Sequence, residues 1–438
     1  MSKPAGTPLV SSSAPMKRGT ASTAEGKGRA RPSLSSSLVL LAPLTSRTSD
    51  GFDYRVLLLK RHAQSRTYEQ AHVFPGGNID PIDLDAAAWS SLFPSDASAT
   101  GPSTSPGLSA SELQSLKICA VRETFEESGL LLLEPTTDSA AAATGGKSAQ
   151  QAWNAFPAEE KTRWREEVHR DGKRFIDLLK TLGEGVKPAL SSLTHWSRWI
   201  TPVILPRRFD THFFIAVLPP SFAPASPHAP THETLVSSDG VETSSADWLT
   251  PLEAIGRAVA HTEGLTAASL ASTSPPATAA GAEPIILHPP QFNLMAELAC
   301  NHRSLASLLE PGSAAAAAAP AAAAAAPVVR PRRVVPFTPQ IAHVLDGQGR
   351  ERRATILPGD DEYAYEAGVG LDEVMERVER SAKGGRRNRS YVLAPRKGQV
   401  GLTVEGCLRE NVVDVLGRGW EDMRGGDSGR PLPGGLKL

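Results

Sequence analysis

The chain has 438 residues, which is enough for one large domain with insertions or for two domains. Its 46 Lys and Arg residues nearly balance its 47 Asp and Glu residues, so no broad basic field points to nucleic acid. Three cysteines without C-x-x-C spacing argue against a disulfide framework or a zinc site and fit a reducing compartment, and no apolar run is long enough to span a bilayer.

The two ends of the chain partly resemble targeting signals. Residues 1–33 are rich in Ser, Pro, Gly, Lys and Arg, with Glu25 as the only acid, which predicts a disordered tail. Basic, Ser-rich segments also serve as organellar targeting peptides, but no clear amphipathic face is present here. The chain ends Leu436-Lys-Leu438, close to the S-K-L peroxisomal address. We expect a location in the peroxisome or mitochondrion, and in the cytoplasm if neither signal functions.

Two short apolar runs, at 38–43 and 54–61, follow the tail. Both are rich in Val and Leu, and a polar turn at 45–51 separates them. Runs of this composition on either side of a turn usually pair with each other, so we predict a β-hairpin.

A pair of glycines lies after the predicted hairpin. The second run ends with Arg61, Arg66 follows, and the sequence then reads Phe74-Pro-Gly-Gly77. Gly76 and Gly77 lack a Cβ atom and therefore let the backbone approach a ligand closely. A carbonyl at this corner could also reach a metal ion.

A long polar segment separates the glycines from a predicted helix. Residues 84–110 are rich in Ser, Ala, Pro and Gly, and we predict a loop, whose length costs little because closure entropy rises slowly. Ser109-Ala-Ser-Glu112 has N-terminal capping chemistry, which predicts that a helix begins near it. The helix is predicted to end at Ser128, before the C-cap residue Gly129. Leu130–Leu133 predicts a buried strand.

The second half of this helix is acidic. Glu123, Glu126 and Glu127 are spaced i, i+3 and i+4, so three carboxylates share one face. Like charges on neighbouring turns repel by about 0.2–0.5 kcal/mol per pair unless a cation neutralises them. Oxygen ligands select a hard ion such as Mg²⁺, with Mn²⁺ as its usual substitute. A solvated acidic face is the alternative, and on charge alone it is the commoner explanation.

A helical segment is predicted after a polar linker at 136–150. Residues 152–182 have helical spacing, and we interpret them as an insertion with a structural role. Gating of a substrate is the alternative. The apolar anchors are Trp153, Phe156, Trp164, Val168, Phe175, Leu178 and Leu179.

Aromatic and basic pairs follow the insertion. Trp196 and Trp199 are interpreted as core residues rather than as a stacking platform. Arg207 and Arg208 precede a predicted strand at 209–218. They are either a solvated charge pair or, beside a site for an anionic ligand, phosphate clamps.

Low-complexity segments interrupt the C-terminal part. We interpret residues 261–283 and 311–333 as linkers, because the second holds an alanine tract that is broken by Pro320 and offers nothing to pack. A helix is predicted at 291–309 and a pair of strands within 334–365. Farther on, a strand is predicted at 390–394 and disorder from Arg418.

The glycine corner and the acidic helix together resemble the signature of the Nudix hydrolases. Gly77 matches its leading position, and Arg122-Glu123-x-x-Glu126-Glu127-x-Gly129-Leu130 matches its closing half. Asp83 stands where the family has its first Glu, and Thr124 stands where an aliphatic residue is usual. The spacer between Asp83 and Arg122 is also far longer than in the family.

The residues before this signature resemble those of Nudix enzymes that cleave coenzyme A. Arg61, Arg66 and Phe74–Gly77 keep the register of that pattern, whereas His62 and Gln70 depart from it. The chain is similar, over most of residues 36–365, to the animal peroxisomal acyl-coenzyme A diphosphatases. Further matching stretches are His195–Pro202, Arg207–Phe214, Trp248–Ala254, Pro289–Phe292 and Leu357–Asp360.

The resemblance implies an α/β fold, a Nudix α/β/α sandwich with a mixed sheet, a helical insertion and a C-terminal extension. It also implies hydrolysis, with Mg²⁺ or Mn²⁺, of the diphosphate bond of coenzyme A or acyl-coenzyme A to 3′,5′-ADP and (acyl-)phosphopantetheine. The partner would be this small nucleotide, with no nucleic acid and no membrane span. The implied organisation begins with a disordered tail at 1–33 and a Nudix domain at 34–260, which contains insertions at 84–110 and 136–190. A linker follows at 261–283. The remainder is a part packed on the Nudix core at 284–365, interrupted by the Ala-rich segment 311–333, and a partly disordered extension at 366–438.

The acidic residues receive distinct roles from this interpretation. Glu123 and Glu127 are expected to be the main metal ligands, and Glu126 a further ligand, directly or through water. Arg122 is expected to pair with a neighbouring carboxylate and orient it. One of the glutamates, or a later acidic residue, would act as general base.

Nudix enzymes often add one acidic residue from a loop after the helix. In the polar stretch 231–247 we prefer Glu242 to Glu233, because it lies six residues before Trp248, as in the similar family. Residues 247–260 then predict a turn and a helix.

Binding of the substrate is assigned to the basic and glycine residues. Arg61 and Arg66 are expected to hold phosphates of the ADP half. Gly76 and Gly77 would lie against the substrate, and Arg207-Arg208 are further candidates for phosphate contacts.

Two other functions stay open at the level of sequence. The same chemistry would hydrolyse another nucleoside diphosphate derivative, such as NADH or an ADP-sugar. The chain could also be a Nudix-fold binding protein without turnover, which the Asp83 departure and the long insertion favour. The complete set of Glu123, Glu126, Glu127 and Arg122 favours an enzyme.

Overall fold

The computed structural model describes residues 31–62, 70–93, 107–134, 149–184, 186–202, 205, 207–218, 236–238, 242–270, 285–310, 327–332, 334, 336–345, 351–357, 387–393 and 403–410. Several predictions fall outside these residues: those for Arg66, Glu233, the alanine tract and the segment from Arg418. Among the described residues, no helix combines the length and apolar character needed to cross a membrane.

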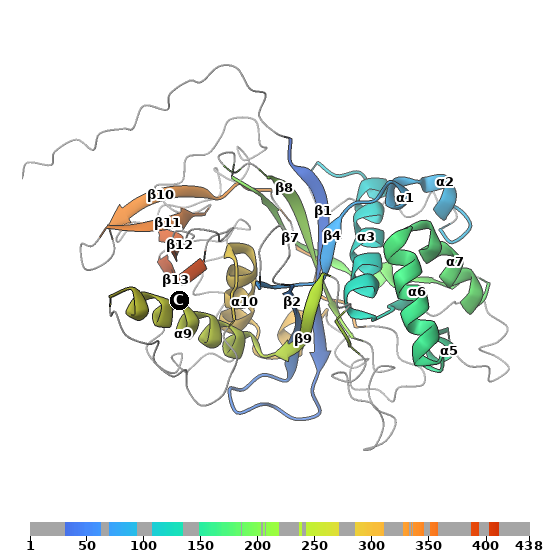
Figure 1. The fold of residues 1–438 in the computed structure, drawn as a ribbon, viewed down its shortest axis with the longest axis horizontal. Helices are drawn as coiled ribbons and strands as arrows, with labels where there is room; N and C mark the ends of the chain where they lie inside the picture. The colour runs from blue at the N-terminus through green and yellow to red at the C-terminus, as the bar shows by residue number, and fades with distance from the viewer. Residues whose placement is uncertain are drawn as a thin grey trace, which may run out of the picture.

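A mixed sheet forms the centre of the molecule (Figure 1). Strands β1 (Ser33–Pro43) and β2 (Tyr54–Arg61) pair antiparallel, so the predicted hairpin is confirmed, with β1 longer than expected. On its other side β1 pairs in parallel with β8 (Phe209–Val217). The seven-stranded sheet is completed by β3 (His72–Val73), β4 (Gly76–Asn78), β7 (Thr194–Ile200) and β9 (Thr243–Leu249), in the order β3-β2-β1-β8-β7 with β4 beside β1 and β9 beside β2.

Both faces of this sheet are covered by helices. In β1, Leu38 and Leu40 face one apolar core while Val39 and Leu41 face another, and all four are buried. A strand buried on both faces is apolar without alternation, which is why 38–43 reads as a continuous apolar run. The arrangement is the α/β/α sandwich that the resemblance implied.

The first core lies under the helices seen to the right of the sheet in Figure 1. Aromatic side chains fill it, with Phe125 against both Trp153 and Phe175. Its helices are α1 (Pro81–Leu84), α2 (Ala86–Trp89), α3 (Ala110–Ser128), α5 (Ala149–Asn154), α6 (Ala158–Arg170) and α7 (Lys173–Leu182). The helical insertion predicted at 152–182 is therefore confirmed as three helices.

Helix α3 has the predicted ends. Ser109 accepts from the backbone N–H of Glu112, whose side chain accepts in return from Ser109, and this capping box begins the helix. Gly129 adopts the left-handed conformation and donates its N–H to the Phe125 carbonyl. These contacts are local in sequence, and local signals predicted them.

Two predictions next to α3 were wrong. Residues 86–89 form helix α2 instead of a loop, because Trp89 packs into the first core and donates its indole N–H to the Ile82 carbonyl. Leu130–Leu132 are buried as predicted, but only Leu133 belongs to a strand. That strand, β5 (Leu133–Glu134), pairs with β6 (Lys187–Pro188), just before the short 3-10 helix η1 (Leu190–Ser192).

The second core lies on the opposite face of the sheet, under α9 (Pro251–Leu270), α10 (Pro289–Asn301) and α11 (Leu305–Leu308). Trp196 and Trp199 are buried in it, as predicted. The single helix predicted at 291–309 is divided, because Ser304 caps a new helix by accepting from the Ala306 N–H. Part of each predicted linker is also structured, since α9 extends to Leu270 and the backbone at Val329 bridges to Leu309.

A second, antiparallel sheet is formed by four C-terminal strands. The strand pair predicted within 334–365 and the strand predicted at 390–394 are confirmed with shifted bounds, and the last strand was not predicted. The strands pair in chain order as β10 (Gln340–Leu345), β11 (Glu351–Ile356), β12 (Arg387–Leu393) and β13 (Thr403–Glu410).

A buried histidine pair in the central sheet predicts sensitivity to acid. The rings of His195 and His212 stack with centroids 5.1 Å apart, and Nδ1 of His212 lies 3.2 Å from Nε2 of His195. Burial lowers the pKa of each imidazole to about 3, with the nearby Arg198 charge adding to the effect. The unfolded chain therefore binds more protons than the folded one between pH 6.5 and 3. The stability present above pH 6.5 is lost as the pH falls towards 3.

We expect the free energy of unfolding to fall more steeply between pH 6.5 and 3 in the wild type than in a His195→Gln/His212→Gln variant. Urea unfolding at a series of pH values measures both slopes. Protonation of carboxylates in acid destabilises both proteins equally, so it does not contribute to the difference between the two slopes. Equal slopes would contradict the assignment of neutral imidazoles to this pair.

Candidate active site

The glycine corner of β4 lies against the acidic turn of α3. The Gly76 N–H donates to Oε2 of Glu127 over 2.9 Å. A Cβ atom on Gly77 would lie 2.5 Å from the Glu123 carboxylate, and one on Gly76 would lie 2.3 Å from the Ser36 carbonyl oxygen. Gly76 therefore lets β4 pass close to the backbone of β1, and a side chain at Gly77 would displace the Glu123 carboxylate from its position.

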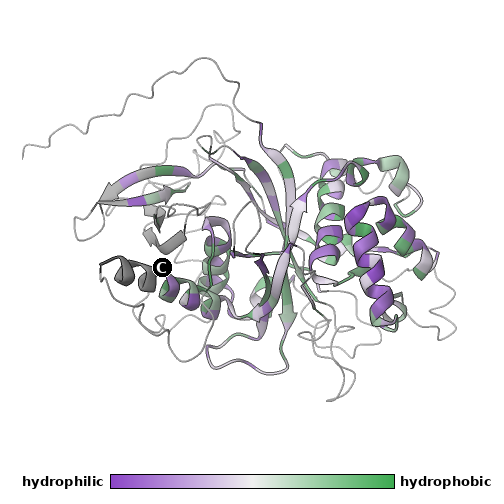
Figure 2. Ribbon diagram, viewed as in Figure 1, coloured by the Kyte–Doolittle hydropathy of each residue, from purple (hydrophilic) through white to green (hydrophobic). Residues whose placement is uncertain are grey.

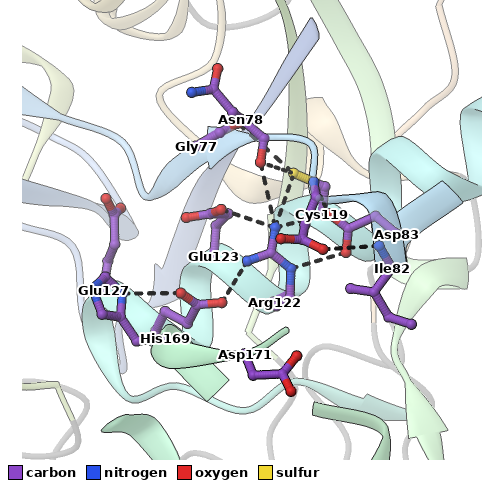
Figure 3. A network of polar contacts seen from close by, with 12 residues as sticks. Gly77, Asn78, Ile82, Asp83, Cys119, Arg122, Glu123, Glu127, His169 and Asp171 are labelled. Atoms are coloured by element: carbon purple, nitrogen blue, oxygen red, sulfur yellow. Dashed lines mark hydrogen bonds and ion pairs between the residues drawn. The ribbon is translucent and has the colours of Figure 1, made fainter. Parts of the chain in front are cut away.

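Arg122 lies at the centre of a buried network of carboxylates (Figure 3). Its Nε and Nη2 donate to the two oxygens of Asp83 over 2.9 and 2.8 Å. Nη2 also lies 3.0 Å from Oε1 of Glu123, and Nη1 donates to Oε1 of Glu126 over 2.5 Å. The structure thus shows the pairing expected of Arg122, with three carboxylates oriented by one guanidinium.

Asp83, the main departure from the family signature, has a defined position. Besides its two bonds to Arg122, its Oδ2 accepts from the Asp80 N–H at the beginning of α1. The carboxylate is fully buried. In this structure Asp83 therefore serves to hold Arg122 and to cap α1.

The electrostatics of Glu123 and Glu127 favour a bound cation. Burial raises the pKa of Glu123 to about 8, Arg122 opposes the shift, and the charges of Glu126 and Asp83 add to it. Burial also raises the pKa of Glu127 well above its ordinary value, and the charge of Glu123 adds to this shift. A carboxylate whose pKa is raised by burial and by neighbouring negative charges is stabilised in the charged form by a bound cation.

The donor set fits Mg²⁺ or Mn²⁺. Within the described part of the chain, no three acidic, His or Cys side chains already surround one point. Mg²⁺ is commonly held by one or two carboxylates, with water and substrate phosphates as its other ligands. Glu123 and Glu127 supply two such carboxylates.

Glu126, the third acidic residue of the turn, has a different environment. Its Oε1 accepts from Arg122, and its Oε2 lies 3.2 Å from Nδ1 of His169 on α6. Both oxygens are therefore engaged within the protein. Its predicted role as a further metal ligand stays a prediction.

Glu242 and Arg61 come together beside Glu127. Oε2 of Glu242 lies 3.6 Å from Nη2 of Arg61, and the Glu242 carbonyl accepts from the His62 N–H over 2.8 Å. The largest influences on the pKa of Glu127 are burial, the charge of Glu123 and the hydrogen bond from Gly76. Arg61 and Glu242 have smaller effects: the charge of Arg61 lowers this pKa, and that of Glu242 raises it. The preference for Glu242 as an added acidic residue stays a prediction, and the structure places it where that role is feasible.

The other basic candidates lie elsewhere or outside the described residues. Nε of Arg208 donates to the Thr201 carbonyl in the connection between β7 and β8. β8 begins beside Ser33 of β1, whereas Gly76 pairs with Ser37, about 13 Å along the strand. The strand register does not bring Arg207-Arg208 next to the glutamates, and their clamp role stays a prediction, as does that of Arg66.

Three residues of the site were not singled out by the sequence. His169 and Arg165 lie on α6 in the insertion, and both contact α3. They are spaced i, i+4 and each follows one of the buried residues Trp164 and Val168, and this pattern could have identified them from the sequence. Cys119 lies in the same network, with its Sγ 3.5 Å from the Asn78 carbonyl oxygen. Burial raises the pKa of this thiol, so it stays protonated.

Comparison with known proteins gives matches to one family. Residues 107–263 match the family model of the NUDT19 Nudix domain. The chain is 35% identical over 233 residues to acyl-coenzyme A diphosphatase NUDT19 of Xenopus laevis, covering 46% of this chain and 54% of that protein. It is 34% identical over 228 residues to the protein of the same name from Gallus gallus, covering 47% and 56%.

A solved structure is also similar to the chain. The crystal structure of a NUDIX hydrolase from Alicyclobacillus acidocaldarius matches with 19% identity and a TM-score of 0.39, covering 61% of this chain and 91% of that one. The chain spans about half the length of the curated relatives it matches. The match to the family model is thus confined to residues 107–263, the part of the chain that contains Arg122 and the acidic turn of α3.

Proposed function

We propose that this protein is a metal-dependent hydrolase that cleaves the diphosphate bond of coenzyme A or acyl-coenzyme A to 3′,5′-ADP and (acyl-)phosphopantetheine. The names of its relatives, acyl-coenzyme A diphosphatases, support the substrate class. One observation supports the chemistry above all: two carboxylates from one helical turn, those of Glu123 and Glu127, lie against the Gly76-Gly77 corner, with Glu127 buried and Glu123 largely buried.

Glu123 and Glu127 would hold Mg²⁺ or Mn²⁺, and the ion would supply charge neutralisation of the diphosphate and acidification of a water molecule. The protein residues around them do the positioning. Arg122 fixes the Glu123 carboxylate, and the Gly76 N–H fixes that of Glu127. Because these partners are already in place, little reorganisation is needed when the substrate binds.

Arg61 and Glu242 would act on the substrate side of the site. Arg61 would donate to a phosphate oxygen, because guanidinium groups match such oxygens well. Glu242 is partly exposed beside it, and it would take a proton from the attacking water or serve as a further ligand. The ion pair between them keeps both side chains at the edge of the site.

The test is a comparison of turnover on coenzyme A, NADH and ADP-ribose, each with Mg²⁺ and with Mn²⁺. We expect the highest kcat/KM on coenzyme A, with 3′,5′-ADP as a product identified by chromatography. A higher kcat/KM on NADH or ADP-ribose would reassign the protein to another nucleoside diphosphate derivative. Mn²⁺ binding without hydrolysis of any of the three would identify a binding protein instead.

A further inference from the structure

Helix α6 of the insertion presents two neighbouring pairs of side chains to the rest of the protein. Trp164 and Val168 are buried in the core next to α3, while most of the helix is hydrophilic (Figure 2). Arg165 and His169 form the adjacent pair at the same i, i+4 spacing, and both contact the acidic end of α3. The helix therefore meets the rest of the protein through an apolar pair and a polar pair that lie side by side.

His169 contacts the oxygen of the Glu126 carboxylate that Arg122 does not. Glu126 is 6% exposed, and its second oxygen is the one that His169 contacts. A carboxylate can only accept a hydrogen bond, so Nδ1 of His169 is the donor. With Arg122 on one oxygen and His169 on the other, the carboxylate has a fixed plane. Glu126 shares its helical turn with Glu123 and Glu127, so the contact also fixes that turn.

Arg165 joins the end of α3 to residues 236–238. Its Nε donates to the Glu126 carbonyl over 2.8 Å, and its Nη1 donates to Oγ of Ser237 over 2.9 Å. The Ser237 N–H donates in turn to the Ser128 carbonyl over 3.1 Å. A cation at the carboxyl end of a helix also interacts favourably with the helix dipole. One guanidinium thus contacts the last turn of α3 and holds Ser237 next to it.

We propose that α6 is a constituent part of the active site, in which His169 and Arg165 are positioning residues. His169 sets the carboxylate of Glu126, and Arg165 sets the last turn of α3 relative to Ser237. The inference rests on the proposed function, because it assumes that the acidic turn binds a divalent ion. Removing partners that orient the ligands of a metal ion typically weakens binding or activity by about 10–100-fold.

His169 provides the sharper test, because its side chain is 42% exposed and its replacement should not unfold the protein. We expect His169→Leu to bind Mn²⁺ about 10-fold more weakly than the wild type, measured by electron paramagnetic resonance of the free ion. His169→Asn can place an amide donor near the position of Nδ1, so its affinity should stay close to that of the wild type. Arg170→Ala, the matched control on the same helix, should change neither Mn²⁺ binding nor melting temperature, because Arg170 is exposed.

Arg165 is tested by a change that keeps its charge. A lysine ammonium cannot reach the Glu126 carbonyl and Ser237 together, so Arg165→Lys should lower kcat while the melting temperature changes little. Ser237→Ala should add nothing further in the Arg165→Lys background, as expected for two residues in one network.

The outcomes separate this inference from the function on which it rests. If the wild type neither binds Mn²⁺ nor hydrolyses a diphosphate, both are overturned. If the wild type does both, and folded His169→Leu and Arg165→Lys bind Mn²⁺ and turn over as the wild type does, only the positioning role is overturned and α6 is a structural insertion.

Discussion

Replacing Glu127 by Gln is expected to lower kcat for diphosphate hydrolysis by roughly 10²–10³-fold, the range seen when one preorganised electrostatic group is removed from an active site. Glutamine keeps the size of the side chain and can still accept from the Gly76 N–H. It cannot supply the negative charge that holds a divalent ion next to Glu123. Steady-state kinetics on coenzyme A with Mn²⁺ measures the loss.

The same substitution should leave the fold intact, which separates a catalytic effect from a structural one. Burial raises the pKa of Glu127, so its charge is costly in the absence of a cation. The melting temperature of Glu127→Gln without metal is therefore expected to equal or exceed that of the wild type. Glu112→Gln, the same change at the exposed beginning of α3, should keep full activity. Unchanged hydrolysis by Glu127→Gln would refute the catalytic assignment of the acidic turn.

The parts of the fold that could be predicted are those whose causes are local. The capping box at Ser109 and the C-cap at Gly129 lie within a few residues of the helix ends that they set. The β1–β2 hairpin is formed by two apolar runs joined by a short turn. Each signal is complete within about ten to twenty residues of sequence, so no knowledge of the tertiary structure is needed.

The parts that were missed depend on distant partners. β9 has the polar sequence Thr-Ser-Ser-Ala-Asp-Trp-Leu, and it becomes a strand because β2 offers it an edge, with Leu57 opposite Trp248. Helix α2 is held by Trp89 in a core built from the insertion. No local propensity encodes such pairings, because the free energy comes from burial against residues far along the chain.

The same division applies to the site. The spacing of Glu123, Glu126 and Glu127 predicted a shared acidic face, and the structure shows that face as three unequal environments. Arg122 contacts Glu123 through Nη2 and Glu126 through Nη1, so the two carboxylates have different surroundings. The same guanidinium also holds Asp83, which precedes the long insertion in the sequence. Helical periodicity cannot distinguish a carboxylate that faces a glycine corner from one that is held by an arginine and a histidine.

Arg122 carries the second large expected effect. Replacing Arg122 by Met is expected to lower the free energy of unfolding by about 3–5 kcal/mol, the usual result when one partner of a buried ion pair is removed. The methionine fills most of the volume but leaves Asp83, Glu123 and Glu126 buried without their shared cation. Urea unfolding of the metal-free protein at pH 7 measures the loss.

A second variant identifies the cause of that loss. Arg122→Met/Asp83→Leu removes both partners of the closest ion pair, so it should recover part of the stability, because a buried pair replaced by apolar side chains is often tolerated. Hydrolysis should not recover, since Glu123 has still lost its orienting contact. Arg174→Met serves as the control, and it should cost far less because its partners Glu167 and Asp177 lie at the surface. If Arg122→Met unfolds at the same urea concentration as the wild type, the carboxylates are not held by this guanidinium, and the geometry of the metal site must depend on other contacts.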